Sequence, residues 1–311
     1  MTKIVFMGTP DFSAPILGRL VEEGYDVALV VTQPDRPKGR KKVLTPPPVK
    51  VKAEALDIPV YQPEKIKDDI EPIKNINPDI IITAAFGQIL PKELLDLPRL
   101  GCINVHASLL PKLRGGAPIH YALLEGHKET GVTIMYMVEK LDAGDIISQK
   151  AIDIKEDDHV GSLHDKLSII GTELLIETLP DIIAEKAKKE EQDESKVTYA
   201  FNIKREQEKI DWNRPARDIY NQIRGLNPWP VAYTILEEQP LKIWWGEIVH
   251  EVNSSNPGEV DSIDEEGFVV KTDDQKGIKI LELQPSGKKK MLASEFLRGV
   301  GSKLELGERL K

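Results

Sequence analysis

The feature that most constrains the fold of this chain is an alternation of short apolar runs with amphipathic segments. The apolar runs include Ile4–Met7, Val27–Val31 and Ile80–Ala84, and the amphipathic segments include Phe12–Glu23 and Ile66–Asn75. Runs of the first kind have the length of buried strands, and segments of the second kind have the length of helices. The pattern therefore predicts an α/β fold with a mostly parallel sheet covered by helices on both faces.

A further predicted strand ends in polar residues. The apolar run Cys102–Val105 precedes a loop punctuated by Pro and Gly at 106–116 and a predicted helix at 118–125. Two more strands are expected at 131–138 and 146–154, followed by a long helix at 160–185. Ligands of open α/β sheets bind beyond the carboxyl ends of the strands, so a site is expected just after Val105.

A chain of 311 residues exceeds what one hydrophobic core usually organises, which predicts two domains. The segment 189–207 is rich in Lys, Glu and Gln and is expected to be an exposed linker between a first domain at 1–188 and a second domain at 208–311. The second domain contains several short strand-like runs separated by turn residues. This pattern predicts a small β-barrel of the oligonucleotide-binding (OB) type.

Composition excludes several classes of protein. The chain is 40 % hydrophobic and 30 % charged, with no apolar run of about 18 residues that could span a membrane. No signal-peptide pattern is present, and the single cysteine, Cys102, suits a reducing compartment, so we expect a cytoplasmic protein. No metal site is expected, because one cysteine is too few and the histidines lack metal-ligand spacing.

Asn104 and His106 stand at the end of the strand that enters the expected crevice. Side chains alternate along a strand, so these two are expected on one face and Val105 on the other. An Asn amide can donate to the oxyanion of a tetrahedral intermediate, and a His with an ordinary pKa of about 6.5 can carry a proton at neutral pH. That pairing suits acyl transfer, although a turn-capping Asn and a structural loop His explain the spacing equally well.

A turn with two carboxylates, Leu141–Asp145, follows the strand expected at 131–138. A carboxylate beside an imidazole can orient the ring and stabilise its charged form, which makes Asp142 a candidate partner of His106. Asp and Gly are also ordinary turn residues, and the sequence does not show that the two side chains meet. The division of work between Asp142 and Asp145 stays open.

One dense basic cluster lies in the loop 33–48, although the formal net charge of the chain is -9. The cluster consists of Arg36, Lys38, Arg40, Lys41 and Lys42. Three consecutive prolines at 46–48 exclude a continuous helix through this loop. One interpretation is a solvated charged loop, and the other is a segment that neutralises substrate phosphates.

The motifs around these residues resemble those of the folate-dependent formyltransferases. An Asn-x-His followed by Ser-Leu-Leu-Pro, an Arg-Gly and an Asp-bearing turn occur at suitable spacing. The segments 6–12 and 32–37 are similar to the members of this family that formylate methionyl initiator tRNA. The similarity extends through nearly the whole chain and is carried by 6–12, 32–37, 101–111, 114–119, 131–133, 141–145 and 225–230.

The resemblance implies a Rossmann-like catalytic domain, 10-formyltetrahydrofolate as donor co-substrate and the α-amino group of initiator Met-tRNA as acceptor. It implies that Asn104, His106 and Asp142 are the catalytic residues. It also implies tRNA contacts from the basic cluster and from the second domain, and a monomer is expected. The implied folate-binding residues are Ser108, Leu109, Leu110 and Pro111.

Three other functions are alternatives. An amino-sugar or glycinamide nucleotide is another possible acceptor for the same chemistry, but a small acceptor needs neither the basic loop nor the second domain. An RNA-binding protein without catalysis is disfavoured by the intact Asn104, His106 and Asp142. A nucleotide-dependent oxidoreductase is disfavoured because the first strand-to-helix turn, Gly8–Phe12, lacks the G-x-G-x-x-G fingerprint.

Overall fold

The computed structural model describes residues 2–39 and 41–311, which form two compact units. The first unit comprises Met1–Pro118, Glu129–Asp153 and His164–Phe201. The second unit comprises Ile119–Lys128, Ile154–Leu163 and Asn202–Lys311. The chain therefore passes between the units more than once, which its composition did not indicate. The domain boundaries after residues 188 and 207 stay a prediction.

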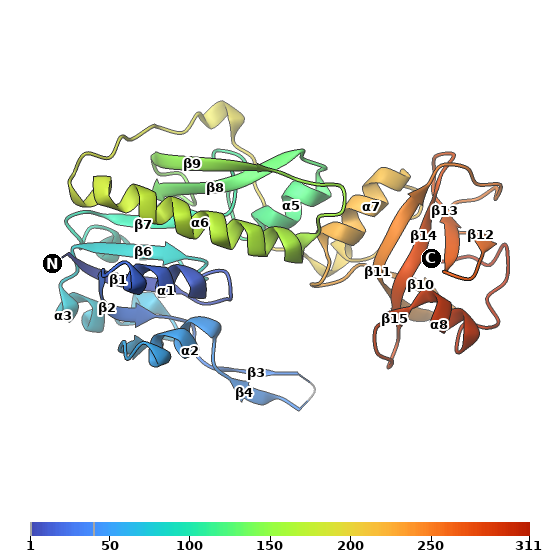
Figure 1. Ribbon diagram of the computed structural model, residues 1–311, viewed down its shortest axis with the longest axis horizontal. Coiled ribbons are helices and arrows are strands. Elements are labelled where there is room, and N and C mark those ends of the chain that lie inside the picture. The colour runs from blue at the N-terminus through green and yellow to red at the C-terminus, as the bar shows by residue number, and fades with distance from the viewer. Residues whose placement is uncertain (1, 40) are drawn as a thin grey trace. The chain divides into compact units, whose positions relative to one another are not determined.

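A seven-stranded sheet in the order β5-β2-β1-β6-β7-β8-β9 is the frame of the first unit (Figure 1). Strands β5, β2, β1, β6 and β7 pair in parallel, whereas β8 and β9 are antiparallel to their neighbours. The predicted mostly parallel sheet is thereby confirmed. The strands are β1 (Lys3–Gly8), β2 (Asp26–Val31), β5 (Val60–Tyr61), β6 (Ile80–Ala84), β7 (Cys102–His106), β8 (Glu129–Tyr136) and β9 (Ile146–Asp153).

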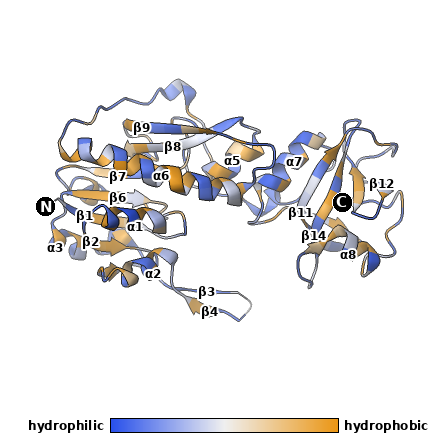
Figure 2. Cartoon of the chain, viewed as in Figure 1, coloured by the Kyte–Doolittle hydropathy of each residue, from blue (hydrophilic) through white to orange (hydrophobic). Residues whose placement is uncertain are grey.

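Helices cover both faces of this sheet. On one face, Val5 of β1 belongs to a buried cluster with Ile73 of α3 and Leu94 of α4. On the other face, Gly171 lets α6 approach the sheet so closely that an added Cβ would lie 3.0 Å from Val105 Cγ1. The strands β1 and β2 are correspondingly apolar in Figure 2. The helices of the first unit are α1 (Ala14–Glu22), α2 (Pro48–Ala55), α3 (Glu71–Ile76), α4 (Lys92–Leu95) and, from His164 on, α6 (Val160–Ile183), whereas α5 (Pro118–Leu124) belongs to the second unit from Ile119 on.

The amphipathic segment predicted at 66–75 is not one helix. It contains a short 3-10 turn, Ile66–Asp68, and then α3, with Asp69 extended at φ -153° between them. Pro72 lies in the first turn of α3. Proline is favoured at a helix start and lacks the N–H that a continuous helix would need there, so the two pieces stay separate.

The basic loop contains a hairpin that the sequence did not indicate. Strands β3 (Arg36–Lys38) and β4 (Val43–Thr45) pair antiparallel, and Lys42 N–H donates to Gly39 O across the turn at 3.1 Å. In Figure 1 this two-stranded ribbon projects from the body of the first unit. We call residues 36–45 the basic hairpin; Arg40 lies outside the described residues.

An antiparallel sheet in the order β10-β11-β14-β13-β12, with β15 paired to β14, forms the second unit. It curls as a half-barrel, which confirms the predicted small β domain. Its core includes Phe268 and Ile280 from the sheet and Ile219 from α7. The elements are α7 (Ala216–Gly225), β10 (Tyr233–Leu236), β11 (Gln239–Val249), β12 (Val260–Ile263), β13 (Phe268–Lys271), β14 (Gly277–Pro285), β15 (Met291–Leu292) and α8 (Ala293–Arg298), with a 3-10 turn at Arg205–Gln207 before them. Another 3-10 turn, Glu194–Lys196, belongs to the first unit.

Candidate active site

Strand β7 brings two of the predicted catalytic side chains to the end of the sheet. It lies between β6 and β8 and carries Asn104 and His106 at its carboxyl end. Val105 faces α6 on one side of the sheet. Because strand side chains alternate, Asn104 and His106 share the opposite face.

The side-chain amide of Asn104 is oriented by the neighbouring strand. Thr83 of β6 is its register partner, and the Thr83 hydroxyl donates to Asn104 Oδ1 at 2.8 Å. With its oxygen occupied, the amide presents its Nδ2 hydrogens as donors. Asn104 is therefore built as a hydrogen-bond donor, which is the requirement for an oxyanion site.

The imidazole of His106 is held in one tautomer when neutral. Its side chain is only 6 % exposed, and Nε2 lies 3.0 Å from Leu113 O. A carbonyl oxygen only accepts, so Nε2 carries the hydrogen. The other ring nitrogen, Nδ1, lies 3.8 Å from Asp142 Oδ2. His106 can thus take a proton at Nδ1, where a carboxylate stabilises the resulting cation.

Asp142, rather than Asp145, supplies the carboxylate that faces His106. Its Oδ2 accepts a hydrogen bond from Gly115 N–H at 2.8 Å. Its backbone lies in the left-handed region at φ 45°, a conformation that Asp tolerates better than most residues. Gly115 is required where it stands: its φ is 121°, and an added Cβ would lie 2.6 Å from Ala200 O. We call Asn104, His106, Leu113–Gly115 and Asp142–Gly144 the catalytic corner.

The four predicted folate-binding residues lie directly after β7, but two of them are turned inward. Ser108 is buried and its hydroxyl donates to Lys112 O at 2.7 Å, while Leu110 is buried in a small cluster with Met135 and Ile146. Leu109 and Pro111 are partly exposed. The residues that hold this segment, Thr133 and Gln149, were missed from sequence; Gln149 Nε2 donates to Leu110 O and to Thr133 Oγ1 at 2.8 and 2.9 Å.

The predicted tRNA-binding residues lie on the basic hairpin. Lys38, Lys41 and Lys42 are exposed. Arg36 is exposed as well, but it forms a two-pronged ion pair with Glu64, with Nη2 to Oε2 at 2.6 Å. The hairpin thus exposes three lysines to solvent, while the charge of Arg36 is paired with that of Glu64.

Within the described part of the chain, Cys102 and the acidic and histidine side chains supply no further site. Cys102 is buried in β7, and this burial raises the pKa of its thiol to about 12, so it is not a nucleophile. Among residues 2–39 and 41–311, no group of three or more His, Cys, Asp or Glu is placed to hold a metal ion. Within the same residues, no helix is long and apolar enough to cross a membrane.

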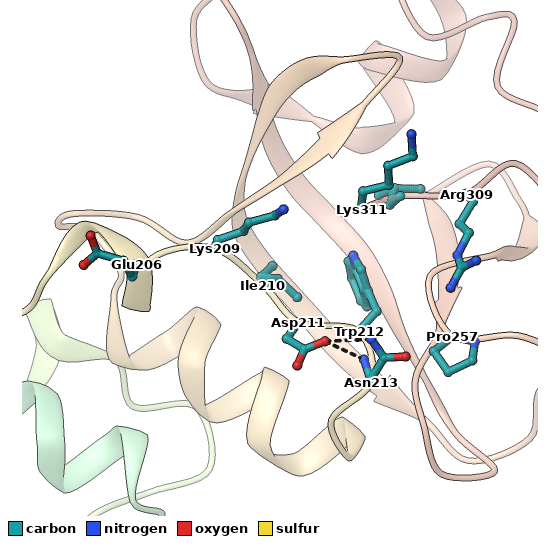
Figure 3. Close-up of a pocket in the computed structure, with 10 residues that line it drawn as sticks. Glu206, Lys209, Ile210, Asp211, Trp212, Asn213, Pro257, Arg309 and Lys311 are labelled. Carbon is teal, nitrogen blue, oxygen red and sulfur yellow. Dashed lines mark hydrogen bonds between the residues drawn. The ribbon is translucent and has the colours of Figure 1, made fainter.

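A pocket of about 510 Å³ lies within the second unit (Figure 3). Its charged side chains have both signs, with Lys209 and Arg309 against Glu206 and Asp211. Asp211 is already engaged with Asn213, to which it accepts two hydrogen bonds at 3.0 and 2.9 Å. The pocket contains no His and none of the predicted site residues, so we assign it no catalysis.

Comparison with known proteins agrees with this geometry. A family described as formyl transferase matches residues 2–179, and one described as formyl transferase, C-terminal domain, matches residues 202–301. The chain is 62 % identical over 312 residues to a methionyl-tRNA formyltransferase of Geobacillus sp. (strain WCH70), covering 100 % of this chain and 98 % of the relative. It is 62 % identical over 301 residues to that of Bacillus subtilis (strain 168), covering 96 % and 95 %.

A solved structure shares the fold at low sequence identity. It is an N-formyltransferase from Helicobacter canadensis in complex with folinic acid and dTDP-3-aminofucose, with a TM-score of 0.70 and 20 % identity, covering 90 % of this chain and 99 % of that one. The family matches in both units and the identity along the full length place the chain without ambiguity. It belongs to the formyltransferase family and, within that family, to the methionyl-tRNA formyltransferases.

Proposed function

We propose that this protein transfers the formyl group of 10-formyltetrahydrofolate to the α-amino group of methionyl initiator tRNA, with Asn104, His106 and Asp142 as its catalytic residues. The observation that carries the proposal is the approach of His106 Nδ1 to Asp142 Oδ2, at 3.8 Å, beside an oriented Asn104 amide. The full-length relatives that carry the name methionyl-tRNA formyltransferase support this acceptor, and the N-formyltransferase that shares the fold and is in complex with folinic acid supports a folate donor.

The chemistry needs a neutral amine, a place for a proton and a donor for an oxyanion. An α-amino group has an ordinary pKa of about 7.7–8.0, so little base strength is required near neutral pH. As the amine nitrogen bonds to the formyl carbon, His106 Nδ1 accepts the proton that the amine loses, and Asn104 Nδ2 donates to the oxyanion. The carbon–nitrogen bond to the folate then breaks, and the leaving nitrogen receives the proton.

Asp142 supports this step without touching the reacting atoms. Its carboxylate faces the ring nitrogen that becomes charged, and the Leu113 carbonyl accepts from the other ring nitrogen. The imidazolium therefore forms between two acceptors that are already in place. Preorganised acceptors of this kind need no rearrangement during the reaction.

The exposed side chains of the predicted binding segments indicate where the two substrates would bind. We propose that the folate lies along Ser108–Pro111, touching the partly exposed Leu109 and Pro111 and the backbone rather than the engaged Ser108 hydroxyl. The lysines of the basic hairpin would neutralise phosphates near the acceptor end of the tRNA, and the second unit would supply another tRNA surface. We also propose that the protein acts as a cytoplasmic monomer.

A parallel transfer assay tests the function. The protein and radiolabelled 10-formyltetrahydrofolate are incubated in three separate reactions. One contains Met-tRNA as acceptor, one an amino-sugar nucleotide and one glycinamide ribonucleotide. Label is expected in formyl-Met-tRNA, and a His106→Gln variant should abolish most of it. Label that enters only a small nucleotide acceptor would overturn the proposal and favour the corresponding alternative.

A further inference from the structure

The segment 190–201 is tied to the catalytic corner along its length. Glu190 pairs with Ile146 through two backbone hydrogen bonds of 2.8 and 2.9 Å. Farther along, Thr198 O accepts from Arg114 N–H at 2.9 Å, and Ala200 N–H donates to Arg114 O at 2.7 Å. Its polar composition predicted an exposed linker and gave no sign of these contacts. The segment thus crosses from the turn that bears Asp142 to the loop that bears Arg114.

Gln192 is the side chain of this segment that enters the corner. It is 5 % exposed, and its Nε2 donates to Asp142 O at 2.9 Å and to Gly144 O at 2.7 Å. Both hydrogens of one amide are therefore used on the two carbonyls of the Asp142 turn. This is the turn in which Asp142 adopts a positive φ, a conformation that an unsupported non-glycine residue leaves readily.

The oxygen of the same amide holds the opposite side of the corner. Gln192 Oε1 accepts from Arg114 Nε at 3.0 Å and from Arg114 Nη2 at 2.8 Å, and Arg114 is fully buried. Arg114 immediately precedes Gly115, whose N–H donates to Asp142 Oδ2. The backbone of Asp142 and the donor to its carboxylate are thus both fixed through one glutamine.

We propose that Gln192 is a positioning residue for the reaction: it fixes the Asp142 carboxylate against His106 by bridging the Asp142 turn to Arg114. This inference rests on the proposed function. Without the two donated hydrogen bonds, the Asp142 turn can relax and Oδ2 can leave the ring nitrogen that becomes charged. The chemical step then slows, whereas the surfaces that bind folate and tRNA keep their form.

The Gln192→Glu variant tests this role. It preserves the size of the side chain and the acceptor for Arg114, but it replaces both donors with an oxygen that repels Asp142 O and Gly144 O. We expect kcat to fall about 10-fold to 100-fold, by analogy with the loss of the hydrogen-bond partners that orient metal-binding side chains. The KM values for folate and for Met-tRNA should stay within about twofold of wild type. Gln192→Asn, which retains a donating amide on a shorter arm, should recover part of the lost kcat.

Gln222 provides a matched control. It is also a buried glutamine, and its Nε2 donates to two backbone carbonyls, those of Gln207 and Lys209, at 2.8 and 3.0 Å. It belongs to α7 of the second unit and is buried, so it is not part of the tRNA surface proposed for that unit. Its Oε1 has no hydrogen-bond partner among the described residues, so Gln222→Glu should lower Tm at least as much as Gln192→Glu and leave kcat near wild type. All assays are run well below the Tm of each variant.

A double-mutant cycle distinguishes an effect that Gln192 exerts through Asp142 from a general destabilisation of the fold. If Gln192 acts through Asp142, then Gln192→Glu combined with Asp142→Ala should have the same kcat as Asp142→Ala alone. Multiplied effects of the two substitutions, or a Gln192→Glu kcat equal to wild type, would overturn the inference. A wild-type protein that forms no formyl-Met-tRNA would instead refute the proposed function, so the two failures are distinguishable.

Discussion

The catalytic corner and the basic hairpin belong to the same unit and are built in opposite ways. In the corner, His106 and Arg114 are buried, and the Asn104 and Asp142 side chains each accept a hydrogen bond. In the hairpin, all three residues of β3 are exposed, and Val43 and Leu44 of β4 are 59 % and 64 % exposed. Bond making requires groups fixed before the substrate arrives, whereas phosphate neutralisation works through mobile charges in water.

The hairpin is nevertheless fixed where it leaves the sheet. The carboxylate of Asp35, just before β3, accepts from Gln62 Nε2 at 2.8 Å and from Lys50 Nζ at 2.9 Å. These hydrogen bonds, that of Gln62 first, lower the pKa of Asp35 below its ordinary value. The hairpin therefore has an anchored base, and its described tip residues Gly39, Lys41 and Lys42 are exposed. We expect substitutions in the corner to affect kcat and those at the tip to affect the KM for tRNA.

The largest effect is expected from the donor in the corner. Asn104→Ala removes the Nδ2 hydrogens that we propose as the oxyanion donor, and kcat should fall by about 10²–10³ with both substrates saturating. Exposed Asn75 serves as control, because Asn75→Ala removes an equivalent amide from α3 without touching the corner. An Asn104→Ala variant that turned over near the wild-type rate would show that the buried corner does not supply the oxyanion donor.

The next largest effect concerns the backbone of the corner. Gly115→Ala adds a Cβ at φ 121° that would lie 2.6 Å from Ala200 O, so the loop must shift and its N–H must leave Asp142 Oδ2. We expect kcat to fall by about 10-fold, as for loss of support at a catalytic group, together with a lower Tm. Gly24→Ala imposes positive-φ strain of about 1–2 kcal/mol without a clash, because nothing lies within 4 Å of its Cβ. Equal kcat values for the two variants would contradict the role assigned to the Gly115 N–H.

The sequence predicted the strands that carry the corner better than the long-range contacts that hold it. Alternation of apolar and amphipathic segments predicted the sheet, and β6 was placed with its observed ends. The shared face of Asn104 and His106 follows from the alternation of side chains along a strand, which is a local property. The pairing of His106 with Asp142 spans two distant segments, so it came from the family resemblance rather than from spacing.

The remaining contacts had no local signal. Gln192 lies in a run of polar residues whose composition is that of a linker, yet its amide is buried against Arg114 and the Asp142 turn. The hairpin has no strand signal in the sequence, because Arg36–Lys38 and Val43–Thr45 are only three residues each, too short for strand patterning. The Gln192 contacts are a consequence of tertiary packing, which single-sequence patterns do not encode, whereas the hairpin is a local pairing of two very short strands.

A smaller effect is expected at the tip of the hairpin. Replacing Lys41 and Lys42 with Ala should raise the KM for Met-tRNA severalfold and leave kcat and the KM for folate near wild type. The salt slope of tRNA binding should fall by about one for each phosphate that is no longer neutralised. The double variant Lys65→Ala, Lys67→Ala removes the same charge from exposed positions outside the hairpin and is the control. An unchanged salt slope in the hairpin variant would mean that its lysines do not bind phosphates.

The smallest effect is expected at Glu194, where an exposed carboxylate meets the buried guanidinium of Arg114. Glu194 is an exposed carboxylate whose Oε1 accepts from the buried Arg114 at 2.9 Å and whose Oε2 accepts from Lys140 at 2.7 Å. The hydrogen bond from Lys140, and then that from Arg114, lowers the pKa of Glu194 in the folded protein. A carboxylate with a lowered folded pKa contributes stability above its unfolded pKa and loses that contribution as pH falls through the folded pKa.

Glu194→Gln should therefore lower Tm slightly at neutral pH, and its difference from wild type should shrink as pH falls below the ordinary glutamate pKa of about 4.3. Gln192 still accepts from Arg114 in this variant, so the corner keeps its buried partner and the effect stays small. Thermal unfolding of both proteins at a series of pH values measures the difference. A Tm loss that is independent of pH would mean that the shape of the Glu194 side chain, rather than its charge, supports Arg114, and that the corner is insulated from exposed charge.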